Sequence, residues 1–213
     1  MINKRQIIIK ILVWVGLRYP EKFIRELAKV EYGVAYYVRK LGDQVPSWKH
    51  KFYAHAIQEK YHGRMLAALI GEAPESEGGM AQKKWAYTPF VGNTQIEGVG
   101  KRYCVMRKIL HGKSLDEYPF IDKLSIMGAL ESIAHSVYHE IAKQAKSPLK
   151  EVALNIAEDE FEHQSCLTEL LVIFGDDFTK AIAWEKHIID CIPYAIFDIL
   201  RIINGNKSAN SKR

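Results

Sequence analysis

The sequence predicts an all-α protein built around a bundle of four long helices. Nearly every segment boundary carries a helix-start or helix-stop residue, and no segment shows the sustained period-two alternation of a half-buried strand. A chain of 213 residues, 48% hydrophobic and 26% charged, suits one soluble domain with a substantial core. We therefore predict one helical domain at 1–205, with its core bundle at about 20–175, and a disordered basic tail at 206–213.

The four core helices are predicted at 20–41, 48–70, 122–146 and 148–175. Pro20 and Pro148 stand at first-turn positions, where the missing N–H of proline costs no helical hydrogen bond. Ser47 and Ser147 precede helices and are expected to cap them through their side-chain oxygens. The ranges hold about 22 to 28 residues, on the order of 33 to 42 Å of helix, and such matched long helices suit a bundle.

The connections between these helices predict their topology. About five residues join the first two helices, and likewise the last two, so each pair is expected to form an antiparallel hairpin. A long crossover at 72–121 separates the hairpins, and its Thr94–Glu97 segment is a capping box for a short helix that stops at Gly112. Further helices are predicted at 7–17 and 178–204, the second with a kink at Pro193.

Two Glu-x-x-His motifs, each in the middle of a long predicted helix, are the candidate functional residues. Glu59 and His62 form the first motif, and Glu160 and His163 form the second. Spacing i, i+3 places both side chains of a motif on one face of its helix. The two motifs stand 101 residues apart, so the chain repeats one metal-binding pattern.

A lone glutamate in the preceding helix accompanies each motif. Glu31 lies 28 residues before Glu59, and Glu131 lies 29 residues before Glu160. In an antiparallel hairpin these offsets place each lone glutamate level with the motif of its partner helix. Buried carboxylates need cationic partners, so the pattern predicts a two-metal centre. Its six predicted ligands are Glu31, Glu59, His62, Glu131, Glu160 and His163.

This arrangement resembles the ferritin-like superfamily of di-iron and di-manganese carboxylate proteins, over about residues 20–175. The resemblance implies a ferritin-like four-helix bundle with a long crossover and additional N- and C-terminal helices. It implies two bound iron ions, with manganese as the alternative. By the same resemblance Glu59 and Glu160 bridge the two metals, Glu31 and Glu131 are terminal ligands, and each metal receives one histidine.

Other polar side chains near the motifs are weaker candidates. His135 and His139 follow Glu131 at i+4 and i+8 and could support the ligands, but ordinary packing or surface positions are favoured. Three acidic residues are expected on a solvated helix face, and most of four tyrosines are expected in the core. Glu97 is expected to act as a helix-capping residue. These acidic residues are Glu158, Asp159 and Glu162, and the tyrosines are Tyr32, Tyr36, Tyr61 and Tyr138.

The implied chemistry is oxidation with O2 or peroxide, because a carboxylate-bridged metal pair can supply two electrons. We favour a di-iron oxidoreductase or oxygenase that acts on a small or apolar substrate with an unidentified electron donor. The alternative is an iron-handling or peroxide-scavenging protein like ferritin or rubrerythrin, without an organic substrate. The chain lacks a four-cysteine rubredoxin module, and its long crossover exceeds what a compact ferritin subunit needs. A hydroxylase of modified tRNA and a metal-free binding protein fit less well.

The remaining features concern partners and location. A net charge of +5 without a clustered basic patch does not favour a nucleic-acid partner, and a homodimer is compatible with the pattern. Three widely spaced cysteines without a Cys-x-x-Cys pair indicate a reducing cytoplasm. The basic start and the apolar 7–17 stretch outline a signal peptide, but Lys10 interrupts the apolar run and no cleavage site follows. We expect this stretch to pack on the bundle, with peripheral membrane contact as the alternative.

Overall fold

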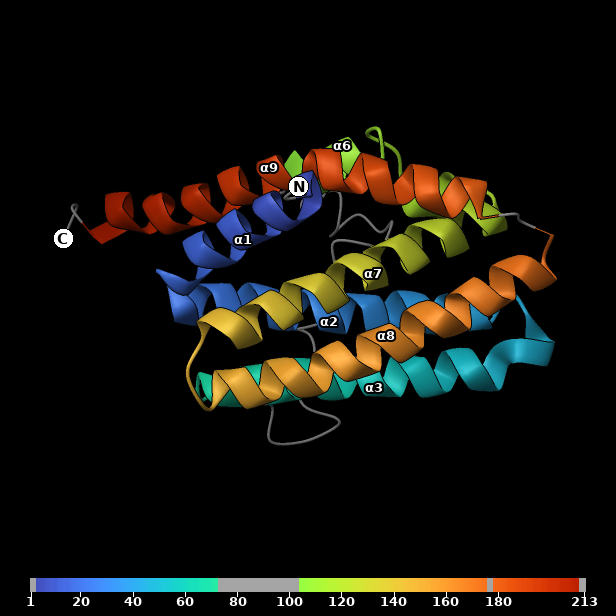
Figure 1. Ribbon diagram of the computed structural model, residues 1–213, viewed down its shortest axis with the longest axis horizontal. Helices are drawn as coiled ribbons and strands as arrows, with labels where there is room; N and C mark the ends of the chain where they lie inside the picture. Colours follow the sequence, from blue (N-terminus) through green and yellow to red (C-terminus); the bar gives the residue numbers. More distant parts are fainter. Residues whose placement is uncertain (1–2, 73–103, 176–177, 211–213) are drawn as a thin grey trace. The chain divides into compact units, whose positions relative to one another are not determined.

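The computed structural model describes residues 3–72, 104–175 and 178–210, and these ranges are helical. They contain seven α-helices and two short 3₁₀ helices, with no strand in the described ranges (Figure 1). The predicted all-α class is therefore confirmed. The chain divides into two compact units, the first made of 1–23, 103–113 and 118–213, and the second of 24–102 and 114–117. Each unit contains most or all of one of the two predicted hairpins.

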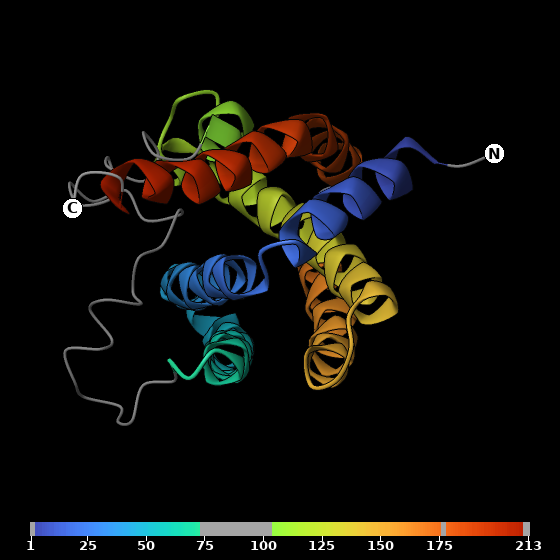
Figure 2. The same cartoon turned by 90° about the vertical axis from the view of Figure 1, so that its left-hand side faces the viewer.

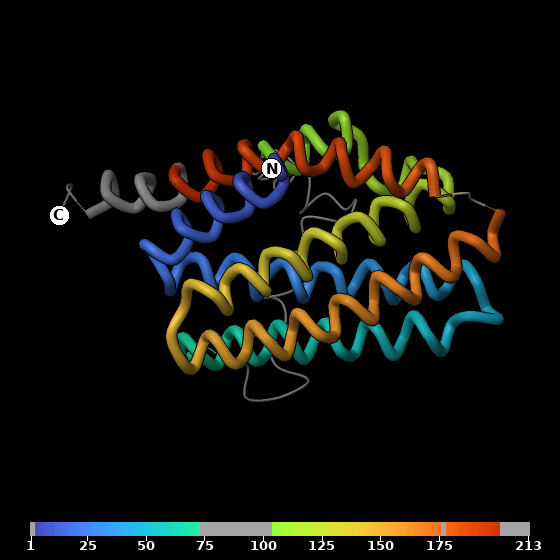
Figure 3. The backbone as a smooth tube through the Cα atoms, viewed as in Figure 1, coloured from blue at the N-terminus to red at the C-terminus, as the bar shows by residue number. Residues whose placement is uncertain are grey.

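The second unit is a helical hairpin that contains most of α2 (Pro20–Gly42) and all of α3 (Lys49–Leu69). The short helix η1 (Pro46–Trp48) lies in the turn between them, and Figure 3 shows the two helices running in opposite directions. Val38 and Leu41 of α2 and Phe52 and Leu66 of α3 are almost completely buried. Burial of these apolar side chains is the main favourable term that holds the two helices in a hairpin.

The first unit is built around a second hairpin, made of α7 (Phe120–Gln144) and α8 (Leu149–Ile173). Two helices from the ends of the chain, α1 (Lys4–Leu17) and α9 (Thr179–Asn210), both contact α7 and contact each other (Figure 2). The hairpin core contains several side chains that expose no surface. These are Leu124, Ile126, Met127, Ile141 and Ile156.

Neither of the predicted serine caps forms. Ser47 lies inside η1, and the N-cap of α3 is Trp48, which makes no capping hydrogen bond. The helix α8 begins one residue later than expected, so Pro148 occupies its N-cap, and the Ser147 hydroxyl instead donates to the side chain of Glu151. A serine caps a helix only from the residue directly before the first helical one, and both serines stand one residue too early.

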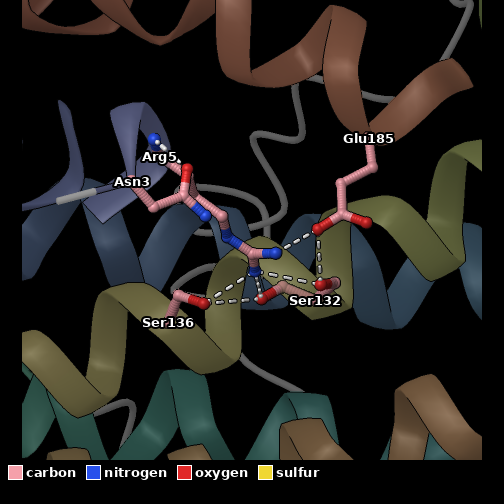
Figure 4. A network of polar contacts seen from close by, with 5 residues as sticks. All are labelled: Asn3, Arg5, Ser132, Ser136 and Glu185. Atoms are coloured by element: carbon pink, nitrogen blue, oxygen red, sulfur yellow. Dashed lines mark hydrogen bonds and ion pairs between the residues drawn. The ribbon is translucent and has the colours of Figure 1, made fainter. Parts of the chain in front are cut away.

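The N-terminal helix α1 packs within the first unit, as the sequence predicts. It begins at Lys4, earlier than expected, because the side-chain oxygen of Asn3 accepts a hydrogen bond from the Arg5 N–H at 3.1 Å. The Arg5 guanidinium donates to the Ser132 carbonyl at 2.6 Å and to the Ser136 hydroxyl at 2.7 Å on α7, and it pairs with Glu185 of α9 (Figure 4). One half-buried cation therefore connects three helices.

The short helix α6 (Cys104–Ile109) is held at both ends by α9. The Val105 N–H donates to the Asp198 carboxylate at 3.0 Å, which satisfies a backbone donor of the first turn. The His187 ring nitrogen Nε2 lies 3.1 Å from the Ile109 carbonyl and can donate to it at the other end. The helix stops before Gly112, whose φ is +76°. The Thr94–Glu97 capping box, with Glu97 itself, lies outside the described residues.

The last helix differs from the sequence prediction at its end. It begins at Thr179 and continues through Pro193 to Asn210, although residues 206–213 were expected to be a disordered tail. An internal glycine such as Gly205 costs a helix about 1 kcal/mol but leaves its backbone hydrogen bonds intact, so it does not by itself end the helix. No helix in the described ranges is both long and apolar enough to cross a membrane.

Candidate metal centre

The second unit brings together three of the predicted ligands, Glu31 from α2 and Glu59 and His62 from α3. We call these three residues the α2/α3 half-site. They are almost completely buried, and their ligand atoms lie within 4.8 Å of one another. The His62 Nδ1 atom is 3.6 Å from Glu59 Oε2 and 4.0 Å from Glu31 Oε2. The i, i+3 spacing within α3 and the hairpin register therefore bring these three side chains to one position.

A close approach of the two helices sets the geometry of this half-site. Tyr32 follows Glu31 in α2, and Gly63 follows His62 in α3. A Cβ atom on Gly63 would lie only 2.9 Å from Cε2 of the Tyr32 ring, which is closer than real Cβ contacts. The absence of a side chain at Gly63 thus lets α2 and α3 come near enough for Glu31 to face His62. Burial raises the pKa of the Tyr32 phenol, and the nearby Arg64 guanidinium opposes the shift.

The first unit holds the other three predicted ligands, Glu131 from α7 and Glu160 and His163 from α8, here called the α7/α8 half-site. All three are buried, with no more than 4% of any residue exposed. The His163 Nδ1 atom lies 3.6 Å from Glu160 Oε2, the same separation that His62 Nδ1 has from its own motif glutamate. Ligand atoms of Glu131 and His163 lie within 4.8 Å of each other. The two motifs therefore share this separation between histidine and glutamate.

A residue that the sequence analysis did not select, His55, also lies in the second unit beside the α2/α3 half-site. Its Nε2 atom is 3.0 Å from Glu59 Oε1, and only 6% of the residue is exposed. His55 stands four residues before Glu59, so helical spacing alone could have placed both on one face. The additional histidines predicted from the sequence follow Glu131, so His55 was not among them.

The secondary candidates have ordinary structural positions. The His135 Nδ1 atom lies 2.8 Å from the Ala157 carbonyl, so this histidine links α7 to α8, and its ring stacks on His139. Tyr36 and Tyr61 are more than half exposed, whereas Tyr32 and Tyr138 are buried. Glu158 and Glu162 are exposed, as predicted, and Asp159 is half-buried.

The donor chemistry of each half-site fits a metal ion. Two carboxylates and one imidazole are buried in each, and buried carboxylates are costly unless a cation or hydrogen bonds compensate them. Oxygen and imidazole ligands suit iron and manganese, whereas thiolates select other metals. The three cysteines are free.

Comparison with known families gave a match to part of the chain. The rubrerythrin family model matches residues 122–188, which include α8, most of α7 and the α7/α8 half-site. The match confirms the resemblance to the ferritin-like di-iron superfamily over this segment and supports a di-iron ferritin-like protein. Comparisons with curated proteins and with solved structures gave no significant match.

Proposed function

We propose that the chain is a di-iron oxidoreductase that uses O2 or peroxide at a centre to which both half-sites contribute. The observation that carries the proposal is the repeated, buried set of two carboxylates and one imidazole on each hairpin. A pair of iron ions, when bound there, supplies two electrons for reduction of the oxidant. Manganese is the alternative metal, and the electron donor is a separate molecule.

The side chains of the chain have distinct roles in this proposal. Glu59 and Glu160 would bridge the two metals, and Glu31 and Glu131 would be terminal ligands. The two motif histidines supply one imidazole to each metal. Because all six residues are buried, the helices exclude bulk water from the ligands and hold them without large rearrangement. This protection favours a controlled redox reaction over loss of the metal.

Two classes of reaction fit this centre. The first is oxidation of a small or apolar organic substrate. The second is reduction of peroxide without an organic substrate, and the match to the rubrerythrin family model is compatible with both classes. The two classes differ in their product balance. Peroxide reduction consumes two electrons and two protons and yields only water, whereas an oxygenase transfers an oxygen atom to the substrate.

Metal content tests the proposal directly. We expect about two iron ions per chain after anaerobic loading and removal of excess metal, measured by elemental analysis, because the donor set matches two sites. The double variant Glu59→Ala, Glu160→Ala should lose this binding. Glu162→Ala is the matched control, since Glu162 is an exposed glutamate on the same helix as Glu160. Binding near zero in the natural chain, or undiminished binding in the double variant, would contradict the proposal.

A single-turnover assay separates redox chemistry from folding. His163→Ala should abolish oxidation of the loaded centre by O2 or hydrogen peroxide while circular dichroism shows unchanged helix content. A natural chain that oxidises much faster with hydrogen peroxide than with O2 would favour the peroxide-reducing class. Oxidation at the natural rate in His163→Ala would show that His163 is structural.

A further inference from the structure

We infer that His55 is a positioning residue that holds the Glu59 carboxylate by a hydrogen bond and so strengthens metal binding at the centre. This inference rests on the proposed function, because it concerns the same centre. It adds a residue outside the repeated six-ligand pattern, and it assigns that residue an action through Glu59 rather than direct ligation.

The contact between His55 and Glu59 has the geometry of a good hydrogen bond. The Nε2 to Oε1 distance is 3.0 Å, and both residues are buried. An ionised carboxylate can only accept, so the imidazole must donate through an Nε2–H group. The same protonated nitrogen cannot at once be a metal ligand. The contact therefore indicates that His55 positions Glu59 and is not itself a metal ligand.

The two oxygens of Glu59 face different partners. Oε1 lies against His55, whereas Oε2 lies 3.6 Å from Nδ1 of His62. The hydrogen bond from His55 therefore fixes the rotation of the carboxylate and leaves Oε2 on the side of the ligand imidazole. Hydrogen bonds of this kind orient ligands before the metal arrives, and their loss typically weakens metal binding about tenfold to a hundredfold.

The second motif offers an internal comparison. In the 101-residue repeat that relates Glu59 to Glu160, the residue equivalent to His55 is Ile156, an apolar residue with no exposed surface. The i−4 position that carries an imidazole donor in α3 is therefore aliphatic in α8. The separation between motif histidine and motif glutamate is nevertheless 3.6 Å in both. The half-sites share a ligand pattern but differ in how their motif carboxylate is held.

Titration with cobalt(II) tests the inference on the full chain. The natural protein should bind two ions, followed by calorimetry and by the absorption bands of bound cobalt. His55→Leu should weaken cobalt binding about tenfold to a hundredfold. His55→Gln should restore most of the affinity, because its amide N–H can donate to Glu59 but is a poor ligand. The control is His50→Leu, which removes an exposed histidine from the same helix.

Ring-nitrogen NMR of the natural protein, with and without zinc(II), gives a second readout that needs no variant. A positioning residue keeps its Nε2–H signal when the metal binds, whereas a ligand loses it. Loss of that signal, or failure of His55→Gln to restore affinity, would overturn the inference in favour of ligation. Two normal cobalt sites in His55→Leu would overturn it while leaving the proposed function intact. A natural chain that binds no cobalt would overturn both.

Discussion

Gly63 is the position at which a single methyl group should disturb the α2/α3 half-site most directly. In Gly63→Ala the new Cβ would lie 2.9, 3.0 and 3.2 Å from three atoms of the Tyr32 ring. That ring is buried and rigid, so α2 and α3 must separate or the ring must leave its rotamer. Overpacking of this kind costs about 1–3 kcal/mol. The better helix propensity of alanine offsets about 1 kcal/mol.

Gly128→Ala is the matched control on the other hairpin. Gly128 is also buried in the middle of a ligand-bearing helix, but a Cβ there would lie 3.8 Å from Leu167, an ordinary van der Waals distance. Only the propensity gain remains, so this variant should be more stable than the natural chain by about 1 kcal/mol. We therefore expect the two variants to differ by about 1–3 kcal/mol in free energy of unfolding, with Gly63→Ala the less stable.

Urea denaturation of the metal-free proteins measures this difference, and cobalt titration measures its effect on the site. Glu31 lies on α2 and His62 on α3, and Oε2 of Glu31 is 4.0 Å from Nδ1 of His62. Separation of the two helices should therefore weaken metal binding in Gly63→Ala. Gly128→Ala should bind metal normally. Equal stability and equal metal affinity of the two variants would refute the argument that the contact between Gly63 and Tyr32 sets the geometry of the half-site.

Three further predictions concern other parts of the molecule. Arg5→Leu should lower the free energy of unfolding by about 1.5–3 kcal/mol in urea denaturation, because it removes the charged donor from several half-buried acceptors. Lys4→Leu, which removes only an exposed ion pair, should cost less than about 1 kcal/mol, and equal losses would contradict the anchoring role of Arg5. Tyr37→Phe should stabilise the chain by about 1 kcal/mol, since the buried hydroxyl has no hydrogen-bond partner in the described part of the chain. Tyr53→Phe is its control, because it loses a bond to a surface carboxylate and should not stabilise. Deletion of residues 1–17 should lower the thermal stability of the chain, and the natural chain should not float with anionic liposomes. Flotation that weakens with salt and disappears on deletion of residues 1–17 would instead support membrane docking.

The helical architecture could be predicted from local patterns because each signal acts within one or two turns. Glycine and proline punctuation located the core helices to within a few residues of α2, α3, α7 and α8. The same short range explains the errors. Whether Ser47 or Ser147 caps a helix depends on where the first helical residue falls, and a shift of one residue removes the cap.

The six candidate ligands were determined by the sequence because helical spacing and the 101-residue repeat are properties of the chain itself. Their burial and the distances within each half-site required the tertiary structure. So did the roles of His55 and Gly63. The sequence around Gly63 and His55 does not distinguish them from other helical glycines and histidines. Only packing places the Tyr32 ring in the space that a Gly63 side chain would occupy. Only packing, likewise, buries His55 against Glu59, because these contacts depend on side-chain rotamers and on the approach of a second helix.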